Sequence, residues 1–409
     1  MGKAGPRSFG KEGELMRTGF SRQVVGVFGV ALFFLLLVGC WGTLQKGAIE
    51  GEVWGENAPL EGVLVEGGGQ STQSDVNGRF LLEQVPAGDT VVFFSHPGYV
   101  GSFVEVEVVG ESVVSLPERV VLLGETDSRL KEYIFTLYER GFYERALEGA
   151  QSFLSQYATS SYAGDVWFIR GASLFELGRY AEAIPALSQA LSASQDFADD
   201  AQYLIAKSFA NGLRDYGKAI EEYLRFIAQY PESELLGNAY YELGDCYYIL
   251  GEYRRALTAY EEAQAAGGDV ARKALYSAAH CLYRLEFYNR AAARFLEYVA
   301  QYPDTDISDD AQYFAGASFY KAFRYGEALT AFEDCVTRYP QGRWYNGILI
   351  APAALFHKGL CLEKLGRYEE AYEVYLGIIR DYPGARWADG SSLIASVRFR
   401  IDWLKQNIF

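Results

Sequence analysis

The sequence is short of the residues that build metal centres and disulfide frameworks. Its 409 residues include five cysteines and three histidines, and no two cysteines form a C-x-x-C pair. His357 and Cys361 stand four residues apart, which would place both on one face of a helix. A stable zinc site needs four protein ligands, or three and a water, and no further ligand stands nearby in the sequence. The sequence therefore predicts no metal, no cofactor and no disulfide framework.

Basic residues are also scarce relative to acidic ones. The chain has 37 lysines and arginines against 53 aspartates and glutamates, a formal net charge of −16. This excess of negative charge would repel a phosphate backbone, which argues against nucleic acid as a partner. The sequence also contains no nucleophile elbow, no metal-ligand triplet and no glycine-rich phosphate loop. It therefore favours a protein that is not an enzyme.

The apolar run near the N-terminus is too short to span a bilayer comfortably. Val24–Val38 makes fifteen residues without a charge, whereas a transmembrane helix needs roughly 20 apolar residues. Arg17 and Arg22 precede the run, in the order typical of a secretory signal, and Met16 is a more typical start than the first residue. The run closes in Leu37-Val38-Gly39-Cys40, which resembles the lipobox of bacterial lipoproteins.

The lipobox resemblance implies that residues 1–39 are a signal peptide and that Cys40 becomes the acylated N-terminus, followed by a linker over 40–46. Two or three acyl chains hold a protein firmly at a membrane. Trp41 stands where an aspartate would favour inner-membrane retention in enteric bacteria. We therefore expect a lipid-anchored protein of the cell envelope, at the outer membrane and facing the periplasm. An uncleaved signal anchor is the alternative.

Residues 47–123 show the alternation of apolar residues that is typical of short β-strands. The alternating positions are Ile49, Gly51, Val53, Val63, Val65, Phe80, Leu82, Val92 and Phe94. Turn signals stand between them at Asp75-Val76-Asn77-Gly78 and Pro86-Ala87-Gly88-Asp89, where asparagine and glycine tolerate positive φ. We expect a small β-sandwich over 47–123.

The same stretch resembles a carboxypeptidase regulatory-like domain of the transthyretin type. The resemblance rests on four segments, which are Pro59–Val65, Thr72–Leu82, Val85–Gly88 and His96–Tyr99. It implies a β-sandwich that serves as a spacer or adhesive module, because the zinc peptidase that such domains accompany is absent from this chain. His96 is expected to be structural.

A tyrosine followed three residues later by an alanine recurs seven times in the rest of the chain. The pairs are Tyr143/Ala146, Tyr180/Ala183, Tyr216/Ala219, Tyr253/Ala256, Tyr288/Ala291, Tyr325/Ala328 and Tyr368/Ala371. Their intervals of 37, 36, 37, 35, 37 and 43 residues predict stacked supersecondary units that bury their apolar faces against one another. The tyrosines of these pairs are called the turn tyrosines below.

Each unit has the pattern of two helices joined at its turn tyrosine. Gly178, Gly251 and Gly366 stand two residues before it, where the first helix must end and the chain reverse. A small residue nine positions before the tyrosine lets the two helices approach closely, and a proline fifteen positions after it ends the second helix. The small residues are Gly171, Gly244, Ala279, Gly316 and Gly359, and the prolines are Pro231, Pro303, Pro340 and Pro383.

The small residue, the turn tyrosine, the alanine, a following aromatic residue and the proline together resemble the tetratricopeptide repeat. The resemblance implies a helical solenoid of seven repeats over 128–386. Repeats of about 36 residues that end in Tyr-Pro, behind a lipobox, look most like the outer-membrane assembly lipoproteins of the BamD type. They also resemble the periplasmic repeat protein of the Tol-Pal system. Seven repeats and an added β-sandwich depart from both.

Three details vary the repeat. The first unit is degenerate, since it has Ile134 at the small position and lacks the proline. The 43-residue interval contains Trp344-Tyr345-Asn346-Gly347, an extension that either carries contacts or is a tolerated insertion. The segment 387–409 is expected to be a capping helix, because four apolar residues in it recur at helical spacing. These are Leu393, Val397, Ile401 and Leu404.

Aromatic residues recur twelve positions before the turn tyrosines and again seven positions further on, Tyr203 joining the set after allowance for one inserted residue. In the repeat family this stripe lines the concave surface that binds peptides, which implies a tyrosine-rich groove for an extended or partly folded polypeptide. Alternatively, the rings pack between adjacent first helices. The candidate residues are Phe168, Phe175, Tyr203, Tyr241, Tyr248, Tyr276, Tyr283, Tyr313, Tyr320 and Phe356. Cys246, Cys281 and Cys361 fall seven positions before the turn tyrosine and are interpreted as small buried residues.

These patterns predict a multidomain α plus β protein, with a small N-terminal β-sandwich followed by an α-solenoid of seven helix pairs and a C-terminal capping helix. The predicted function is a membrane-anchored protein–protein interaction scaffold of the bacterial cell envelope, in outer-membrane protein assembly. Its partners would be other envelope proteins or extended polypeptides, and self-association through the repeats is open. A Tol-Pal or cell-wall division adaptor is the alternative. An accessory subunit of an envelope enzyme and a substrate-capture lipoprotein are further alternatives.

Overall fold

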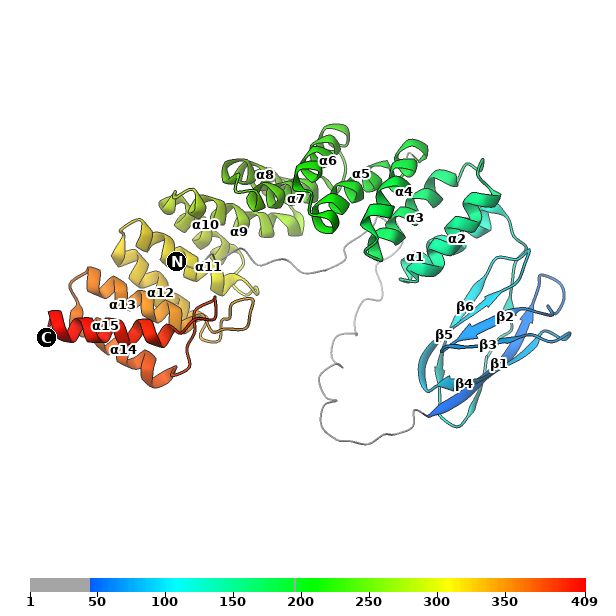
Figure 1. The fold of residues 1–409 in the computed structure, drawn as a ribbon, viewed down its shortest axis with the longest axis horizontal. Coiled ribbons are helices and arrows are strands. Elements are labelled where there is room, and N and C mark those ends of the chain that lie inside the picture. Colours follow the sequence, from blue (N-terminus) through cyan, green and yellow to red (C-terminus); the bar gives the residue numbers. More distant parts are fainter. Residues whose placement is uncertain (1–44, 195) are drawn as a thin grey trace. The chain divides into compact units, whose positions relative to one another are not determined.

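A computed structural model describes residues 45–194 and 196–409 of the protein. It confirms the predicted fold class, with a small β region followed by a helical solenoid (Figure 1). The predicted signal peptide over 1–39 and the predicted lipidation of Cys40 lie outside the described residues. The described chain forms two compact units, 45–204 and 205–409. Among the described residues, no helix combines the length and the hydropathy needed to cross a bilayer.

The β domain consists of two four-stranded sheets. The first contains β1 (Lys46–Trp54), β4 (Arg79–Pro86), β7 (Val113–Ser115) and β8 (Val120–Val121), and the second runs in the order β3 (Gln70–Gln73), β2 (Leu64–Gly67), β5 (Gly88–Ser95) and β6 (Ser102–Val108). The predicted apolar positions of 47–123 form its core: Ile49, Val53, Val63, Val65, Phe80, Leu82, Val92 and Phe94 are at most 5% exposed. The alternation therefore follows the two faces of each strand.

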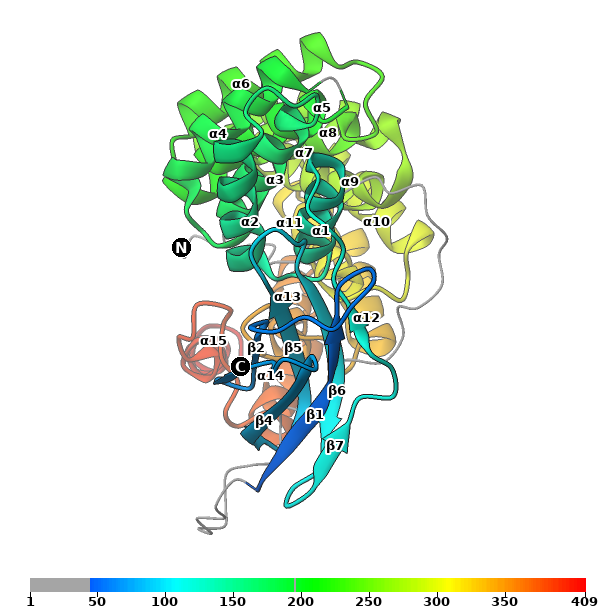
Figure 2. The same cartoon turned by 90° about the vertical axis from the view of Figure 1, so that its right-hand side faces the viewer.

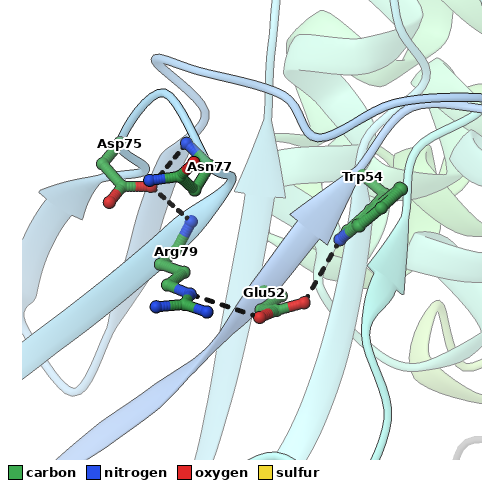
Figure 3. Close-up of polar contacts among 5 residues, drawn as sticks. All are labelled: Glu52, Trp54, Asp75, Asn77 and Arg79. Carbon is green, nitrogen blue, oxygen red and sulfur yellow. Dashed lines mark hydrogen bonds and ion pairs between the residues drawn. The ribbon is translucent and has the colours of Figure 1, made fainter.

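The predicted turn at Asp75–Gly78 is closed by its own side chain (Figure 3). Asp75 Oδ1 accepts hydrogen bonds from the backbone amides of Asn77 and Arg79, both at 2.8 Å, and Gly78 has a φ of 74°. These bonds, the one from Arg79 above all, lower the pKa of the Asp75 carboxyl. On the adjacent strand β1, Glu52 accepts from the side chains of Arg79 and Trp54, each at 3.3 Å. The turn thus fixes the register of β4 against β1.

The helices of the first unit begin directly after the β domain. They are α1 (Asp127–Glu139), α2 (Tyr143–Gln156), α3 (Ala163–Glu176), α4 (Tyr180–Ala193) and the start of α5 (Ala198–Lys207). The degenerate first repeat compensates within its own pair: Ile134 takes the small position of α1, and a Cβ added to Gly149 of α2 would lie 3.0 Å from Ile134 Cγ1. In this repeat the small residue at the helix contact is therefore Gly149 of the second helix, whereas in the other repeats it is on the first helix.

The second unit continues the same pattern. Its elements are η1 (Ser208–Leu213), α6 (Tyr216–Gln229), α7 (Leu236–Ile249), α8 (Tyr253–Ala266), α9 (Gly268–Arg284), α10 (Tyr288–Gln301), α11 (Ser308–Lys321), α12 (Tyr325–Arg338), α13 (Ala351–Lys364), α14 (Tyr368–Asp381) and α15 (Leu393–Asn407). All seven turn tyrosines are the first residue of a second helix. The close approach predicted from small residues is confirmed, because a Cβ on Gly244 would lie 2.6 Å from the Tyr260 ring.

The inserted residue before the third turn tyrosine is absorbed by a change of helix type. Residues Ser208–Leu213 form a π-helical turn directly after α5, and a π-turn accommodates one residue more than an α-turn. Tyr203 consequently stays in phase with the aromatic stripe of the other first helices. It is 5% exposed.

The predicted capping helix over 387–409 begins later than expected. The helix α15 starts at Leu393, where the Ser392 hydroxyl accepts a hydrogen bond from the Ala395 amide and caps it. The preceding residues form a tight loop in which Arg386 and Ser392 are bridged and Gly390 has a φ of 84°. A glycine at positive φ cannot be part of an α-helix, which explains why the helix begins at Leu393 and not at 387.

The β domain and the first helix pair share an interface within the first unit, and Figures 1 and 2 both show α1 and α2 at one end of the strands. Phe142, at the turn between α1 and α2, packs edge-on against Phe93 at 5.1 Å and Phe103 at 5.4 Å between ring centroids. Arg145 lies over Phe93 with its Cζ 3.8 Å from the ring centroid, and it forms an ion pair with Glu66 at 3.2 Å. The β domain therefore docks on the first turn.

Candidate functional site

Most of the ten candidate groove residues are buried. Phe168, Phe175, Tyr203, Tyr241, Tyr248, Tyr276, Tyr313 and Phe356 are at most 9% exposed. Only Tyr283 and Tyr320 are half-buried. Eight of the ten positions are therefore buried, but the alternative of packing between adjacent first helices does not describe their main contacts, which are with second helices and turn tyrosines.

In four repeats of the second unit, the ring twelve positions before the turn tyrosine packs on an aromatic residue of its own second helix. The pairs, with their centroid distances, are Tyr241–Tyr260 at 5.5 Å, Tyr276–Phe295 at 5.9 Å, Tyr313–Phe332 at 5.7 Å and Phe356–Tyr375 at 5.7 Å. The four second-helix rings are at most 1% exposed. These pairs form the core of four repeats, and such contacts add about 0.5–1.5 kcal/mol to simple burial.

The ring seven positions further on packs instead against the turn tyrosine. The contacts, again between centroids, are Phe175–Tyr180 at 5.2 Å, Tyr248–Tyr253 at 5.2 Å, Tyr283–Tyr288 at 5.5 Å and Tyr320–Tyr325 at 5.5 Å. The stripe thus has two levels with different partners. At the second level, later in the chain, the rings retain some exposure.

The half-buried side chains gather on the first helices of three consecutive repeats. Phe314 of α11 lies 5.9 Å from Tyr283 of α9, and Tyr320 of α11 lies 6.3 Å from His357 of α13, between ring centroids. We call Tyr283, Phe314, Tyr320 and His357 the aromatic face. Phe314 and His357 were not among the predicted groove residues, although both stand at one repeated position, eleven residues before their turn tyrosines.

The histidines near this face carry no charge at neutral pH. Burial lowers the pKa of His280 to about 3, with a further contribution from Arg284. Burial also lowers the pKa of His357, opposed by its hydrogen bond with the Ala353 carbonyl at 2.9 Å. A neutral aromatic surface suits the apolar side chains and backbone of a polypeptide better than a charged chain end.

Two similar loops flank the face, and sequence reasoning found only one of them. The loops share the pattern Arg-Trp-x-(Asn or Asp)-Gly, at 343–347 and again 43 residues later at 386–390. In each, the arginine Nη1 donates to the glycine carbonyl, at 2.6 Å and 2.9 Å. The tryptophan packs back on a buried ring of the preceding first helix, Trp344 on Tyr313 at 4.9 Å and Trp387 on Phe356 at 5.2 Å. Asn346 Nδ2 donates to the Ala388 carbonyl at 2.6 Å and joins the loops.

One repeat earlier, the corresponding side of α7 is acidic. Burial raises the pKa of Asp245 to about 8, Glu242 adds to the rise, and the hydrogen bond from Tyr260 at 2.5 Å opposes it. Burial likewise raises the pKa of Glu242, opposed by Lys207 and Lys273. Asp245 is therefore largely protonated at neutral pH.

Replacing Asp245 with asparagine should stabilise the protein at pH 8 and not at pH 4. The folded pKa lies above the unfolded value, so the folded state binds more protons and its stability falls as pH rises from about 4 to about 8. Removing the charge cancels that loss, and we expect the melting temperature at pH 8 to rise by roughly 2–4 °C, about 1 kcal/mol. Asp381→Asn is the control for thermal melts: its pKa is lowered by Arg380, so it should gain nothing at pH 8.

The buried cysteines match their predicted role. Cys246, Cys281 and Cys361 are at most 2% exposed, and burial raises the pKa of each thiol. They are unpaired, as is Cys335. Within the described residues, no three histidine, cysteine or acidic side chains come together as a metal site would require.

Comparison with known proteins identifies a family whose model matches this chain. The tetratricopeptide repeat model matches residues 136–201, 170–234, 210–271, 241–306 and 318–386, which together span more than half of the chain. Similar solved structures include the C-terminal part of a repeat-containing protein from Cytophaga hutchinsonii, with 18% identity over 64% of this chain and 100% of that chain and a TM-score of 0.49. A tetratricopeptide repeat protein from Parabacteroides merdae has 14% identity over 69% of this chain and 99% of its own, with a TM-score of 0.42. YrrB, described as having an unusual peptide-binding site, has 18% identity over 47% of this chain and 94% of its own, with a TM-score of 0.39. No curated protein matches the sequence.

Proposed function

The chain belongs to the tetratricopeptide repeat family, whose members mediate protein–protein interactions, and from this premise we propose that it is a membrane-anchored, non-catalytic interaction scaffold of the bacterial cell envelope. The observation that carries the proposal is the aromatic face, an uncharged surface of Tyr283, Phe314, Tyr320 and His357 on three stacked repeats. Its rings are partly buried and held by neighbouring rings, so little side-chain entropy is lost when a polypeptide binds.

The anchor is the lipid on Cys40, supported by the basic residues, the apolar run and the lipobox that precede it. The proposed location is the outer membrane, facing the periplasm, supported by Trp41 in the position where an aspartate would favour inner-membrane retention. The β domain is proposed to be a carboxypeptidase regulatory-like module. Its docking on Phe142 and Arg145 supports a role as an N-terminal cap of the solenoid.

The process served is outer-membrane protein assembly, on the similarity of the Tyr-Pro repeats to BamD-type lipoproteins. Extended or partly folded polypeptides are the ligands that such a surface takes. The Tol-Pal resemblance keeps a division adaptor as the second candidate, and the two make different predictions about which proteins contact the aromatic face.

A photo-crosslinking amino acid at Tyr320 of the full chain, irradiated in living cells, should capture the partner. Mass spectrometry that identifies a barrel assembly factor or a nascent outer-membrane protein supports the first candidate, and a Tol component supports the second. The control is the same substitution at Leu376, which is 38% exposed on the second helix α14. Equal capture at both positions would contradict a role for the aromatic face.

With the partner in hand, the double variant Tyr283→Ser/Tyr320→Ser should bind it at least tenfold more weakly, because well-packed aromatic contacts each contribute on the order of 1–2 kcal/mol. The rings are half-buried against Tyr288 and Tyr325, so a thermal melt must accompany the binding assay. Unchanged affinity with a lowered melting temperature would assign both rings to packing alone.

A further inference from the structure

The turns between the two helices of a repeat carry exposed apolar side chains throughout the second unit. Each of its five turns has at least one, at positions from four to one before the turn tyrosine. They are Leu213, Ile249, Leu250, Phe287, Phe323 and Leu365, with exposed fractions from 40% to 77%. Single exposed apolar residues are ordinary, whereas a series repeated at the same structural position marks an interaction surface.

Direct contacts join three neighbouring turns, and the other two stand at the same position of their repeats. Arg284 Nη2 donates to the Tyr253 hydroxyl at 2.6 Å, which links the turn after α9 to the turn after α7. Arg324 Nη1 donates to Asn289 Oδ1 at 3.2 Å, which links the turn after α11 to the turn after α9. We call residues 212–218, 249–255, 284–290, 321–327 and 364–370 the turn edge. The exposed apolar side chains therefore lie along one edge of the solenoid.

Phe323 is the residue that packing explains least. It has a φ of 61° and is 77% exposed. The equivalent positions of other repeats hold Gly178, Gly251 and Gly366, with φ from 74° to 78°. Glycine adopts this backbone conformation without strain, and a bulky side chain there is a rare outlier. A strained and exposed phenylalanine contributes little to the stability of the fold, which points to a use outside it.

The turn edge has the opposite charge balance to the rest of the chain. Its five segments contain ten basic and six acidic residues, in a chain whose net charge is −16. Two of the loops at the other ends of the helices are acidic: 230–235 and 302–307 together contain four acidic residues and no basic one. The two tryptophan loops, 339–350 and 382–392, contain two basic residues and one acidic residue. Arginines stand beside the apolar groups, such as Arg290, whose Cζ lies 5.8 Å from the Phe287 ring centroid.

The first two turns of the chain lack this character. Residues 139–145 and 176–182 contain three basic and four acidic residues and no large apolar residue with high exposure. The apolar residue of the first turn, Phe142, is covered by Phe93 and Phe103 of the β domain. Among the turns between paired helices in the described chain, the combination of exposed apolar and basic side chains is thus found in those of the second unit.

We propose that the turn edge binds the surface of an anionic lipid bilayer, with Phe287 and Phe323 entering the headgroup layer and the arginines contacting phosphates. Separate apolar side chains that protrude beside cations suit a fluid interface, which adapts to any spacing, better than a protein partner, which would need matching pockets. Juxtamembrane cations are attracted to anionic lipid over a Debye length, while remote acidic groups are screened at physiological salt. The proposal rests on the envelope location proposed above, since a lipid anchor would hold the edge near a bilayer.

Co-sedimentation with vesicles tests this in the absence of any acyl chain. Residues 45–409 contain every described helix, strand and core residue, and this segment is incubated at 0.15 M salt with vesicles of phosphatidylethanolamine and phosphatidylglycerol, or of phosphatidylcholine alone. We expect binding to the anionic vesicles and at least tenfold weaker binding to phosphatidylcholine. Raising the salt should weaken binding further.

Two variants separate lipid binding from folding. Phe323→Gly should melt at the same or a higher temperature, because glycine fits the positive φ. The double variant Phe287→Ser/Phe323→Gly should reduce vesicle binding at least tenfold, because it removes the two rings that would be buried in the bilayer. Arg254→Glu/Arg290→Glu should reduce binding to anionic vesicles by a similar factor. Tyr345→Ser, at a residue that is 68% exposed on the loop after α12, should change nothing.

Absence of binding to anionic vesicles, or equal binding by the parent and the Phe287→Ser/Phe323→Gly variant, would overturn the proposal. A protein captured through Phe323 without any vesicle binding would overturn it in favour of a protein partner. The anchor itself is tested separately by fractionation of the full chain carrying Cys40→Ser, so failure of the bilayer proposal leaves the proposed scaffold function standing.

Discussion

Replacing Glu363 with alanine is expected to destabilise the last repeat by about 3–5 kcal/mol, because it leaves a partly buried arginine without its counter-ion. Glu363 is 9% exposed at the end of α13. It accepts hydrogen bonds from the Tyr375 hydroxyl of α14 at 2.7 Å and from Arg400 Nε of α15 at 2.9 Å. One carboxylate therefore joins three helices. Urea unfolding followed by far-ultraviolet circular dichroism would measure the loss.

The control for this variant is Glu370→Ala. Glu370 forms an exposed ion pair with Arg367, and such pairs contribute only about 0–1 kcal/mol. The triple variant Glu363→Leu/Tyr375→Phe/Arg400→Met removes every polar partner at once and should recover most of the lost stability, as replaced buried ion pairs often do. If Glu363→Ala unfolds at the same urea concentration as Glu370→Ala, the three-helix junction does not depend on this carboxylate.

The helix boundaries were predictable because their signals are local. The turn tyrosine begins the second helix in all seven repeats, and the predicted prolines follow the ends of α6, α10, α12 and α14. The glycine at the end of a first helix is a weaker signal. In three repeats that position is held by Arg214, Glu286 and Phe323, which also have a positive φ. The sequence of those turns does not predict this left-handed backbone conformation.

The fate of the aromatic stripe was not predictable from spacing alone. Residues seven apart share one side of a helix, but spacing does not say whether that side meets solvent or a neighbouring helix. The deciding information is the partner: Tyr241 is buried because Tyr260 of the second helix lies against it. Phe314 and His357 lie outside the two spacings, twelve and five residues before the turn tyrosine, that define the predicted stripe.

The second tryptophan loop was missed for a different reason. The interval of 43 residues after Tyr325 drew attention to the insertion around Trp344, while Trp387 lay after the last turn tyrosine and had no interval to reveal it. The repeated pattern at 343–347 and 386–390 is nevertheless present in the sequence. Because the second loop occupies the start of the predicted capping segment, the helix begins at Leu393, six residues later than the predicted 387.

Contacts between segments that are far apart in the chain are the feature that a sequence pattern predicts least well. The sequence divides 47–123 from 128–386 and says nothing about whether the two domains touch. In the structure, Phe142 of the first turn meets Phe93 and Phe103, some 40–50 residues earlier in the chain. Such pairings depend on how whole elements are placed, which no local pattern encodes.

Phe142→Ser should therefore uncouple the β domain from the solenoid. The substitution removes two edge-on aromatic contacts and the burial of one ring, and we expect a loss of roughly 2–3 kcal/mol at this interface. In hydrogen exchange followed by mass spectrometry, peptides from β6 and α2 should open about 30-fold to 100-fold more readily, since 1.4 kcal/mol corresponds to a factor of ten. Peptides from α12 to α15 should keep the parent rates.

The same substitution at Phe287 provides the matched control. Phe287 stands one residue before its turn tyrosine, as Phe142 does, but it is 40% exposed. Phe287→Ser should leave exchange near its own turn almost unchanged. If both variants behave alike, the β domain is only tethered to the first repeat. If only Phe142→Ser accelerates exchange in β6 and α2, the β domain replaces the missing preceding repeat, and a solenoid repeat with an atypical small residue is stabilised by a neighbour of a different fold.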